Sequence, residues 1–243
     1  MSAYSAAVAK WQSHQLRSPA DLDRLLFDFT PRFTYHSALL EGREIAYSTV
    51  EEFFHTGAVS HFSGDPKELV QLYSHKRCYD YLREHVMARD DLDTLLVLEI
   101  HRLLTSGTYS EPFFLANGER PGELKKQNFV TAVNAVGASA RDVGAELDRL
   151  MEEISGYCGA ELLEAAAYFH SRFENIHPFA AGNGTVGRVL VNYFLLIRDH
   201  PPLIFFSEDK ERYLQCLSAY DHQRNPGPLA DFLEEELAKT WAE

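Results

Sequence analysis

The segment most informative about the fold is residues 161–198, which read ELLEAAAYFHSRFENIHPFAAGNGTVGRVLVNYFLLIR. Apolar residues recur at spacings of three and four on both sides of its centre, a period typical of helices with one buried face. The proline and the two glycines between these halves interrupt a helix. We therefore predict one helix ending near Asn175, a loop over residues 177–184, and a second helix over about 185–198.

The helical period extends along most of the chain, for example over residues 69–82 and 92–103. It predicts an all-α protein of about eight to ten helices. Proline or glycine marks the expected helix boundaries, which are Pro31, Asp65-Pro66, Pro121-Gly122, Gly156, His177-Pro178, Pro201-Pro202 and Pro226-Gly227-Pro228.

One segment departs from the helical pattern. Residues 117–137 contain Gly118 and Pro121-Gly122, followed by alternating apolar residues that include Phe129 and Val133. This pattern is typical of a short β-hairpin or an extended flap.

The composition limits the class of protein. The chain has 243 residues, of which 45% are hydrophobic and 24% charged, which excludes disordered and collagen-like classes. The 36 acidic and 23 basic residues give a net charge of −13, so we expect no nucleic acid partner. No stretch approaches the ~18 uncharged apolar residues of a membrane span, so we expect no membrane partner.

The cysteines indicate a reducing compartment. Cys78, Cys158 and Cys216 lie far apart and form no C-x-x-C pair, which argues against a disulfide framework or a structural zinc site. The first residues have neither a basic segment nor an apolar run typical of a secretory signal. We expect a cytoplasmic protein.

The loop over residues 177–184 combines several groups that bind phosphate. Gly182 and Gly184 allow backbone conformations in which N–H groups converge at a helix N-terminus, where a phosphate is favoured. Arg188, one turn into the helix, could add a bidentate contact, and His177 could accept a hydroxyl proton. A G-N-G turn or a histidine alone is more often structural, but the fixed offsets within these 12 residues are specific. The combination indicates phosphoryl or nucleotidyl transfer.

The string from His177 to Arg188, H-P-F-A-A-G-N-G-T-V-G-R, resembles the Fic (filamentation induced by cAMP) family motif H-P-F-x-(D/E)-G-N-G-R-x-x-R. Residues 98–103 and 121–125 resemble the family's helix and the entry to its substrate flap. The resemblance covers residues from about 30 to 240. It implies an all-α, Fic-like helical bundle with a short β-hairpin flap, which transfers AMP from ATP to a hydroxyl of a target protein.

The resemblance also implies roles for single residues. His177 would be the general base, and Arg188 would contact the terminal phosphate. The remaining phosphate and nucleotide positions would be Gly182, Asn183, Gly184, Thr185, Tyr213 and Asp221, the last two near the adenosine. The flap residues Thr131, Ala132, Val133 and Asn134 would pair with the target's backbone by strand addition.

Two positions depart from the family motif. Ala181 stands where the family has an acidic residue that holds magnesium, and alanine offers no oxygen ligand. Thr185 stands where the family has an arginine, so one cationic phosphate contact is missing. Both departures predict a weakened active site. Without the acidic residue, phosphates, water and neighbouring groups alone would hold Mg²⁺.

A second motif concerns regulation. Residues 37–42, S-A-L-L-E-G, resemble the family's inhibitory pattern (S/T)-x-x-x-E-(G/N). Glu41 would then pair with Arg188 and displace the terminal phosphate of ATP. The alternative is that Ser37 and Gly42 only bound a helical turn and that Glu41 is solvated. We divide the chain into residues 1–90, a helical region with this motif, and residues 91–243, a Fic-like catalytic core.

Other functions remain open at this point. The missing acid favours a degenerate nucleotide-binding or regulatory protein, or a transferase that uses another phosphate-containing donor. A metal hydrolase using His170, Glu174 and His177 lacks a recognisable ligand motif. Phe53 and Phe54 could belong to the core or to a homodimer face, because periodicity does not separate the two.

Overall fold

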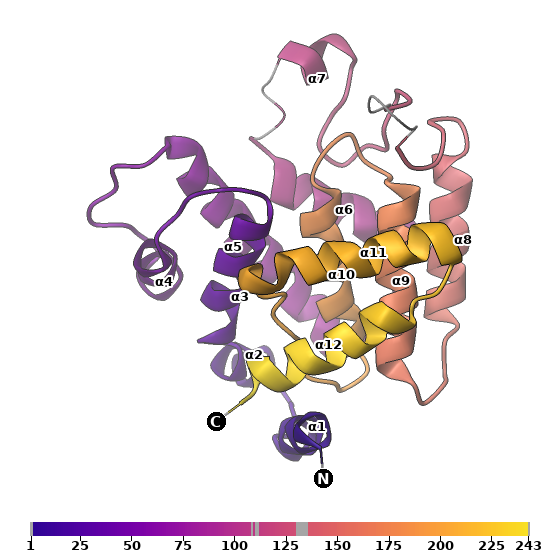
Figure 1. Cartoon of the computed structure of the whole chain (residues 1–243). Helices are drawn as coiled ribbons and strands as arrows, with labels where there is room; N and C mark the ends of the chain where they lie inside the picture. Colours follow the sequence, from indigo (N-terminus) through magenta and orange to yellow (C-terminus); the bar gives the residue numbers. More distant parts are fainter. Residues whose placement is uncertain (1, 108, 110–111, 130–135, 243) are drawn as a thin grey trace.

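The structure is a computed structural model that describes residues 2–107, 109, 112–129 and 136–242. These residues form α-helices, one 3-10 helix and no strand (Figure 1). The elements are α1 (Ala3–Ser13), α2 (Pro19–Leu25), α3 (Phe29–Leu40), α4 (Tyr47–Thr56), α5 (Pro66–Ala88), α6 (Thr94–Thr105), α7 (Pro112–Ala116), α8 (Val143–Ser155), α9 (Leu162–Ile176), α10 (Asn183–Leu196), η1 (Ser207–Asp209), α11 (Lys210–Gln223) and α12 (Gly227–Thr240). The all-α prediction is confirmed.

The structure has more helices than the sequence pattern indicated. The helices α2 and α7 have only seven and five residues, too few for an apolar period to stand out. The boundary predicted at Pro31 corresponds to the start of α3 at Phe29, and Pro31 itself lies in the first turn of that helix. A proline is tolerated there, since the first N–H groups of a helix have no partner within the helix.

Short polar side chains begin several of the helices. The Ser18 side chain accepts a hydrogen bond from the Asp21 N–H at the start of α2. Asp65 and Asp93 do the same for Lys67 and Leu96 at the starts of α5 and α6. These caps satisfy N–H groups that would otherwise lack a partner, and they fix where each helix begins.

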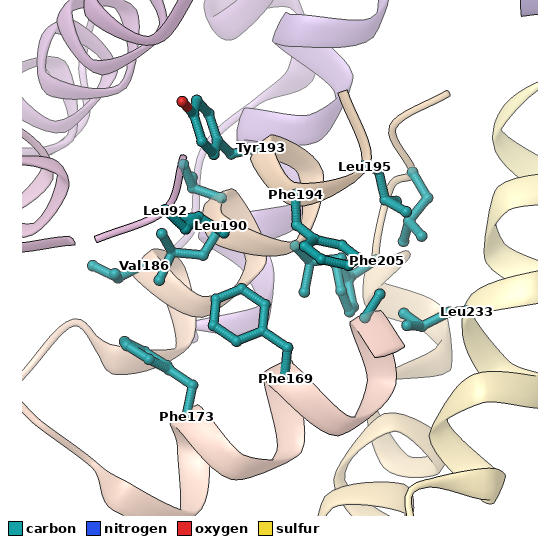
Figure 2. Packing of buried hydrophobic residues seen from close by; sticks show 14 of the residues in the cluster. Leu92, Phe169, Phe173, Val186, Leu190, Tyr193, Phe194, Leu195, Phe205 and Leu233 are labelled. Atoms are coloured by element: carbon teal, nitrogen blue, oxygen red, sulfur yellow. The ribbon is translucent and has the colours of Figure 1, made fainter. Parts of the chain in front are cut away.

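The helices α9 and α10 form the centre of the molecule. In Figure 2, Phe169 and Phe173 of α9 lie beside Val186 and Leu190 of α10, and all four side chains are buried. Burying each such side chain stabilises the fold by roughly 1.5–3 kcal/mol. The C-terminus of α9 and the N-terminus of α10 are therefore held firmly by the core.

The first helices pack onto this centre. The helix α3 contacts α4, η1 and α10, and α5 contacts α6 and α10. A smaller cluster of Val50, Phe53 and Leu72 joins α4 to α5, with Phe54 partly buried against it. Phe53 is thus a core residue of this cluster.

The expected flap lies between α7 and α8. Its residues Thr131, Ala132, Val133 and Asn134 lie outside the described residues. At the described ends of that segment, the Val136 N–H donates to the Phe129 carbonyl oxygen at 2.8 Å. This bond brings the two ends of the segment together.

Among the described residues, none of the helices combines the length and hydropathy that a membrane span needs.

Candidate active site

The loop between α9 and α10 begins with a sharp change of direction at His177. Its backbone is left-handed, with φ 51° and ψ 64°, and its N–H still donates to the Phe173 carbonyl oxygen at 3.0 Å. A non-glycine residue in this region costs about 1–2 kcal/mol, and such strain concentrates at functional sites. The turn ends α9 and points the chain into the loop.

Gly182 ends the loop directly before α10. Its φ is 84°, and a Cβ atom at this position would lie 2.8 Å from Cγ2 of Thr105. Both the conformation and the close approach to α6 therefore require glycine. The free N–H groups of the first turn of α10 follow at once, as expected for an anion site.

The side chain of Asn183 shapes this loop from within. Its Oδ1 accepts from the Phe179 N–H and its Nδ2 donates to the Phe179 carbonyl oxygen, both at 2.9 Å. The residue is 3% exposed. Both polar ends of the side chain are thus engaged within the loop, so the main chain of the loop is what it offers to a ligand.

The backbone of Ala181 is fixed by Tyr109 and His101. The Ala181 N–H donates to the Tyr109 hydroxyl at 2.9 Å, and the Ala181 carbonyl oxygen lies 3.1 Å from both that hydroxyl and His101 Nε2. His101 Nδ1 accepts from the Gly122 N–H at 2.8 Å, which places the ring proton on Nε2. Burial lowers the pKa of His101 to about 4, so the ring is neutral at pH 7. This network joins the loop to the start of the predicted flap.

Arg188 is the buried cation of the site, with a side chain that is 2% exposed. Its guanidinium donates to the Ser37 hydroxyl at 2.9 and 3.1 Å and to the Ser37 carbonyl oxygen at 3.2 Å. It also forms an ion pair with Glu41, 2.8 Å from Nη2 to Oε1, and lies 3.4 Å from the Thr185 hydroxyl. Two segments more than 140 positions apart in sequence therefore meet at this side chain.

The Glu41 carboxylate lies at the N-terminus of α10. A Cβ atom on Gly184 would be 2.7 Å from Glu41 Oε1 and 3.0 Å from Arg188 Nη1. Glu41 is thus an internal anion in the place where the helix N-terminus and Arg188 both favour negative charge.

The end of α3 places Glu41 there. Gly42 follows with φ +75°, and the N–H groups of Gly42 and Arg43 donate to the Leu39 and Ala38 carbonyl oxygens at 3.0 and 3.1 Å. These bonds form a Schellman motif, which needs a left-handed residue after the helix.

Residues 91–195 match the model of the Fic/DOC family. This part of the chain is a Fic/DOC family domain. The chain is also 26% identical over 207 residues to "Protein adenylyltransferase Fic" of Culex quinquefasciatus and 24% identical to the protein of that name in Aedes aegypti. These matches include 82% of this chain and 38% of each relative, so the chain spans well under half of their length.

Solved structures share the fold of the Fic domain and of the helices before it. A Fic-domain-containing signalling protein from Bacteroides thetaiotaomicron matches with a TM-score of 0.77 and 24% identity, covering 98% of this chain and 94% of that one. Fic-1 from C. elegans matches with a TM-score of 0.74 and 19% identity, covering 98% of this chain and 67% of that one.

The Fic domain holds His177 in its neutral form. Burial, followed by the nearby charge of Lys125, lowers the pKa of His177 to about 4. A neutral imidazole at pH 7 can accept a proton, so the protonation state suits a general base.

Two predicted nucleotide residues, Tyr213 and Asp221, follow the Fic domain in the chain and contact α9. The Tyr213 hydroxyl is 2.7 Å from His170 Nε2, and Tyr213 is only 4% exposed. Asp221 accepts a 2.8 Å hydrogen bond from the Asn175 side chain and is exposed. Tyr213 therefore supports α9 from within the core, whereas Asp221 lies at the surface near the end of α9.

The buried layer between α9 and α10 contains two unpartnered polar atoms, His170 Nδ1 and Glu174 Oε1. Burial raises the pKa of Glu174 to about 7 and lowers that of His170 to about 3. Both atoms would lie within 3.0 Å of a Cβ atom on Gly187, so the two helices approach closely there. The part of the chain that the structure describes contains no group of three or more metal-ligating side chains.

Sequence reasoning missed several contacts that build this site. The predicted inhibitory motif included Ser37, but it did not indicate the direct hydrogen bond between Ser37 and Arg188. The sequence pattern assigned no role to His101, Tyr109 or Lys125. The resemblance of residues 98–103 and 121–125 to the family was the available signal for His101 and Lys125.

Proposed function

We propose that this chain is a protein adenylyltransferase that Glu41 holds in an inhibited state. The observation that supports this most is the Glu41–Arg188 ion pair at the N-terminus of α10, next to the loop that carries His177. The names of the curated relatives support the same class of reaction.

In the proposed reaction, a hydroxyl oxygen of a target protein attacks the α-phosphorus of ATP. The hydroxyl proton passes to the neutral imidazole of His177 as the new P–O bond forms. The bond between the α-phosphorus and its bridging oxygen breaks, and pyrophosphate leaves with the electron pair. The product is a target side chain that carries AMP.

The remaining residues bind and orient in this proposal. The backbone at Gly182 and Gly184 and the N-terminus of α10 hold phosphate oxygens, and Arg188 holds the terminal phosphate. Thr185, Tyr213 and Asp221 keep the roles that the family resemblance implies. Flap residues 131–134 pair with the backbone of the target, which is the second partner besides ATP.

Inhibition follows from competition for one guanidinium. When Glu41 occupies Arg188, the terminal phosphate loses its main cationic contact, and ATP binds weakly or in an unreactive pose. Residues 1–90 are then a regulatory region and residues 91–243 the catalytic core.

The residues at the loop do not fit a metal ion held by the protein. The Ala181 side chain has no oxygen, and the described part of the chain offers no cluster of metal-ligating side chains. A magnesium ion would arrive with ATP, held by phosphate oxygens and water. We assign no step of the reaction to it.

A second function is favoured by the two residues that depart from the family motif. Ala181 and Thr185 both weaken the handling of phosphate charge, so a nucleotide-binding regulator without transfer is the competing proposal. His177 opposes it, because a cradle that only binds nucleotide has no requirement for a strained, neutral histidine.

Incubation with α-labelled ATP distinguishes the transferase from the nucleotide-binding regulator. Wild type, Glu41→Gly and Glu41→Gly/His177→Ala are incubated with magnesium or manganese and with cell lysate, then analysed by gel autoradiography and intact mass. We expect label on protein with Glu41→Gly and none once His177 is removed. Nucleotide binding by calorimetry without any label would support the regulator and overturn the transferase.

A further inference from the structure

Lys125 is a buried lysine without a carboxylate hydrogen-bonded to its ammonium group in the described structure. It is 2% exposed, and the one acceptor that the described residues offer its Nζ is the Val136 carbonyl oxygen, at 3.1 Å. The next residue, Lys126, is exposed and forms a 2.6 Å ion pair with Glu123. An ammonium has three donors, so Lys125 retains two for a ligand.

The Lys125 ammonium lies against the catalytic loop. The backbone N–H of Lys125 donates to the Pro178 carbonyl oxygen at 2.9 Å. A Cβ atom on Gly137 would be 2.9 Å from Lys125 Nζ and 2.5 Å from His177 Cβ. The ammonium and the base of the His177 side chain are thus neighbours of the same point at the closing end of the flap.

The charged groups that face this ammonium are few. Burial lowers the pKa of Lys125 to about 8, and Glu119 acts in the opposite direction. Glu119 is 1% exposed, and its Oε1 accepts from the Lys126 N–H at 2.9 Å. Lys125 is therefore still mainly protonated at pH 7. His177 is the other titratable side chain beside this ammonium, and the positive charge of Lys125 opposes its protonation.

A buried cation costs free energy unless an anion compensates it. The site next to it is the one that would receive a chain of phosphates, and it lacks the arginine that the family motif has at position 185. We propose that Lys125 supplies the missing cation, contacting the phosphoryl group beside His177 and keeping the imidazole unprotonated. This inference rests on the proposed transfer of AMP.

The kinetic test uses the Glu41→Gly protein as its reference. Lys125→Met, Lys125→Arg and Lys126→Met are added to it, and kcat and KM for ATP are measured with labelled ATP. We expect Lys125→Met to lower kcat about tenfold or more, since a charged hydrogen bond is lost. Lys125→Arg should retain most of the activity, and the exposed control Lys126→Met should match the reference. An unchanged kcat in a folded Lys125→Met protein would overturn the proposal.

A second readout does not depend on transfer. NMR titration of the His177 imidazole should show a higher pKa in Lys125→Met than in Lys126→Met, because one positive charge has gone. An equal pKa in the two would overturn the coupling of Lys125 to His177. If label is absent from every variant but the His177 pKa still rises, the adenylyltransferase proposal fails and the electrostatic part of this inference stands. Should Lys125→Met not fold, Lys125→Gln takes its place in both measurements.

Discussion

Arg188 and Glu41 form an ion pair in which the two partners have very different surroundings. The Arg188 side chain is 2% exposed, whereas the Glu41 side chain is 34% exposed and follows the last turn of α3. Arg188 is enclosed by α10 and α3, so it has no route into water without disrupting the core. Separation of the pair therefore requires Glu41 to move.

Replacing Glu41 tests this pair by nucleotide affinity. Glu41→Gly should tighten ATP binding about ten- to a hundredfold, because the phosphate regains a charged hydrogen bond worth about 1.5–3 kcal/mol. The measurement is calorimetric titration with ATP. Glu44→Gly removes the same charge from an exposed position nearby and should bind ATP as wild type does. Equal affinity of Glu41→Gly and wild type would contradict the regulatory role.

Replacing Ser37 tests the contact between α3 and α10. Ser37→Ala removes the hydroxyl that accepts two hydrogen bonds from the buried guanidinium. We expect the free energy of unfolding to fall by about 1–3 kcal/mol and ATP affinity to rise, since α3 is held less firmly. Urea denaturation and calorimetry measure the two effects. Ser48→Ala, at an exposed position of α4, is the control. A drop in stability without any gain in affinity would mean that Ser37 is only structural.

Stability should depend on pH through a set of buried histidines. Burial lowers the pKa of each to about 3 or 4, and the set is His75, His101, His170 and His177. Between about pH 4 and 6.5 the unfolded chain binds more protons at these positions than the folded chain. The free energy of unfolding therefore rises with pH across this window, and it falls when the protein is acidified.

Two buried carboxyl groups give the opposite dependence of folding stability on pH. Burial raises the pKa of Glu174 and of Glu236 to about 7, so each favours the folded state when protonated and loses that contribution as pH rises from about 4.5 to 7. The four histidines outweigh them below pH 6.5. Urea denaturation at pH 5 and 6.5 should show lower stability at pH 5, and Glu174→Gln should enlarge the difference. A smaller difference in Glu174→Gln would show that the carboxyl is ionised in the folded protein.

Restoring the two motif residues tests whether the departures limit activity. In the Glu41→Gly protein, Ala181→Asp with Thr185→Arg should raise magnesium-dependent transfer, because a carboxylate oxygen and a second cation return to the phosphates. Steady-state rates with and without magnesium measure the gain. Thr185 is 6% exposed, so a thermal melt of the double variant checks that the arginine is accommodated. An unchanged rate in a folded variant would show that other residues, such as Lys125, already compensate.

The sequence predicted the part of the site whose residues are close together in the chain. The offsets from His177 to Arg188 indicated a helix, a loop and a second helix, and the structure places the helix ends at Ile176 and Asn183. The S-x-x-x-E-G pattern indicated the Glu41–Arg188 contact, which the structure contains. Local turns and caps determine these features, so local sequence is sufficient to predict them.

The features that the sequence did not predict depend on contacts between residues far apart in the chain. Tyr109 and His101 bond to Ala181 across 72 and 80 positions, and no periodicity encodes such pairs. The hydrogen bonds that the Asn183 side chain forms within its own loop were not indicated either, because the motif specifies a residue type and not the direction of its amide. The boundary expected at Pro31 lies two residues from the observed helix start at Phe29, because a proline in a first turn and a proline that breaks a helix look alike in sequence.

The helix end at Gly42 has a kinetic consequence. Because Glu41 follows directly after the last turn of α3, withdrawing it needs only fraying of that turn, an event of roughly microseconds or less. Enzymes of ordinary speed turn over in milliseconds or longer. Glu41 would therefore re-equilibrate many times within each catalytic cycle, and inhibition would scale the steady-state rate without producing a lag after ATP is added.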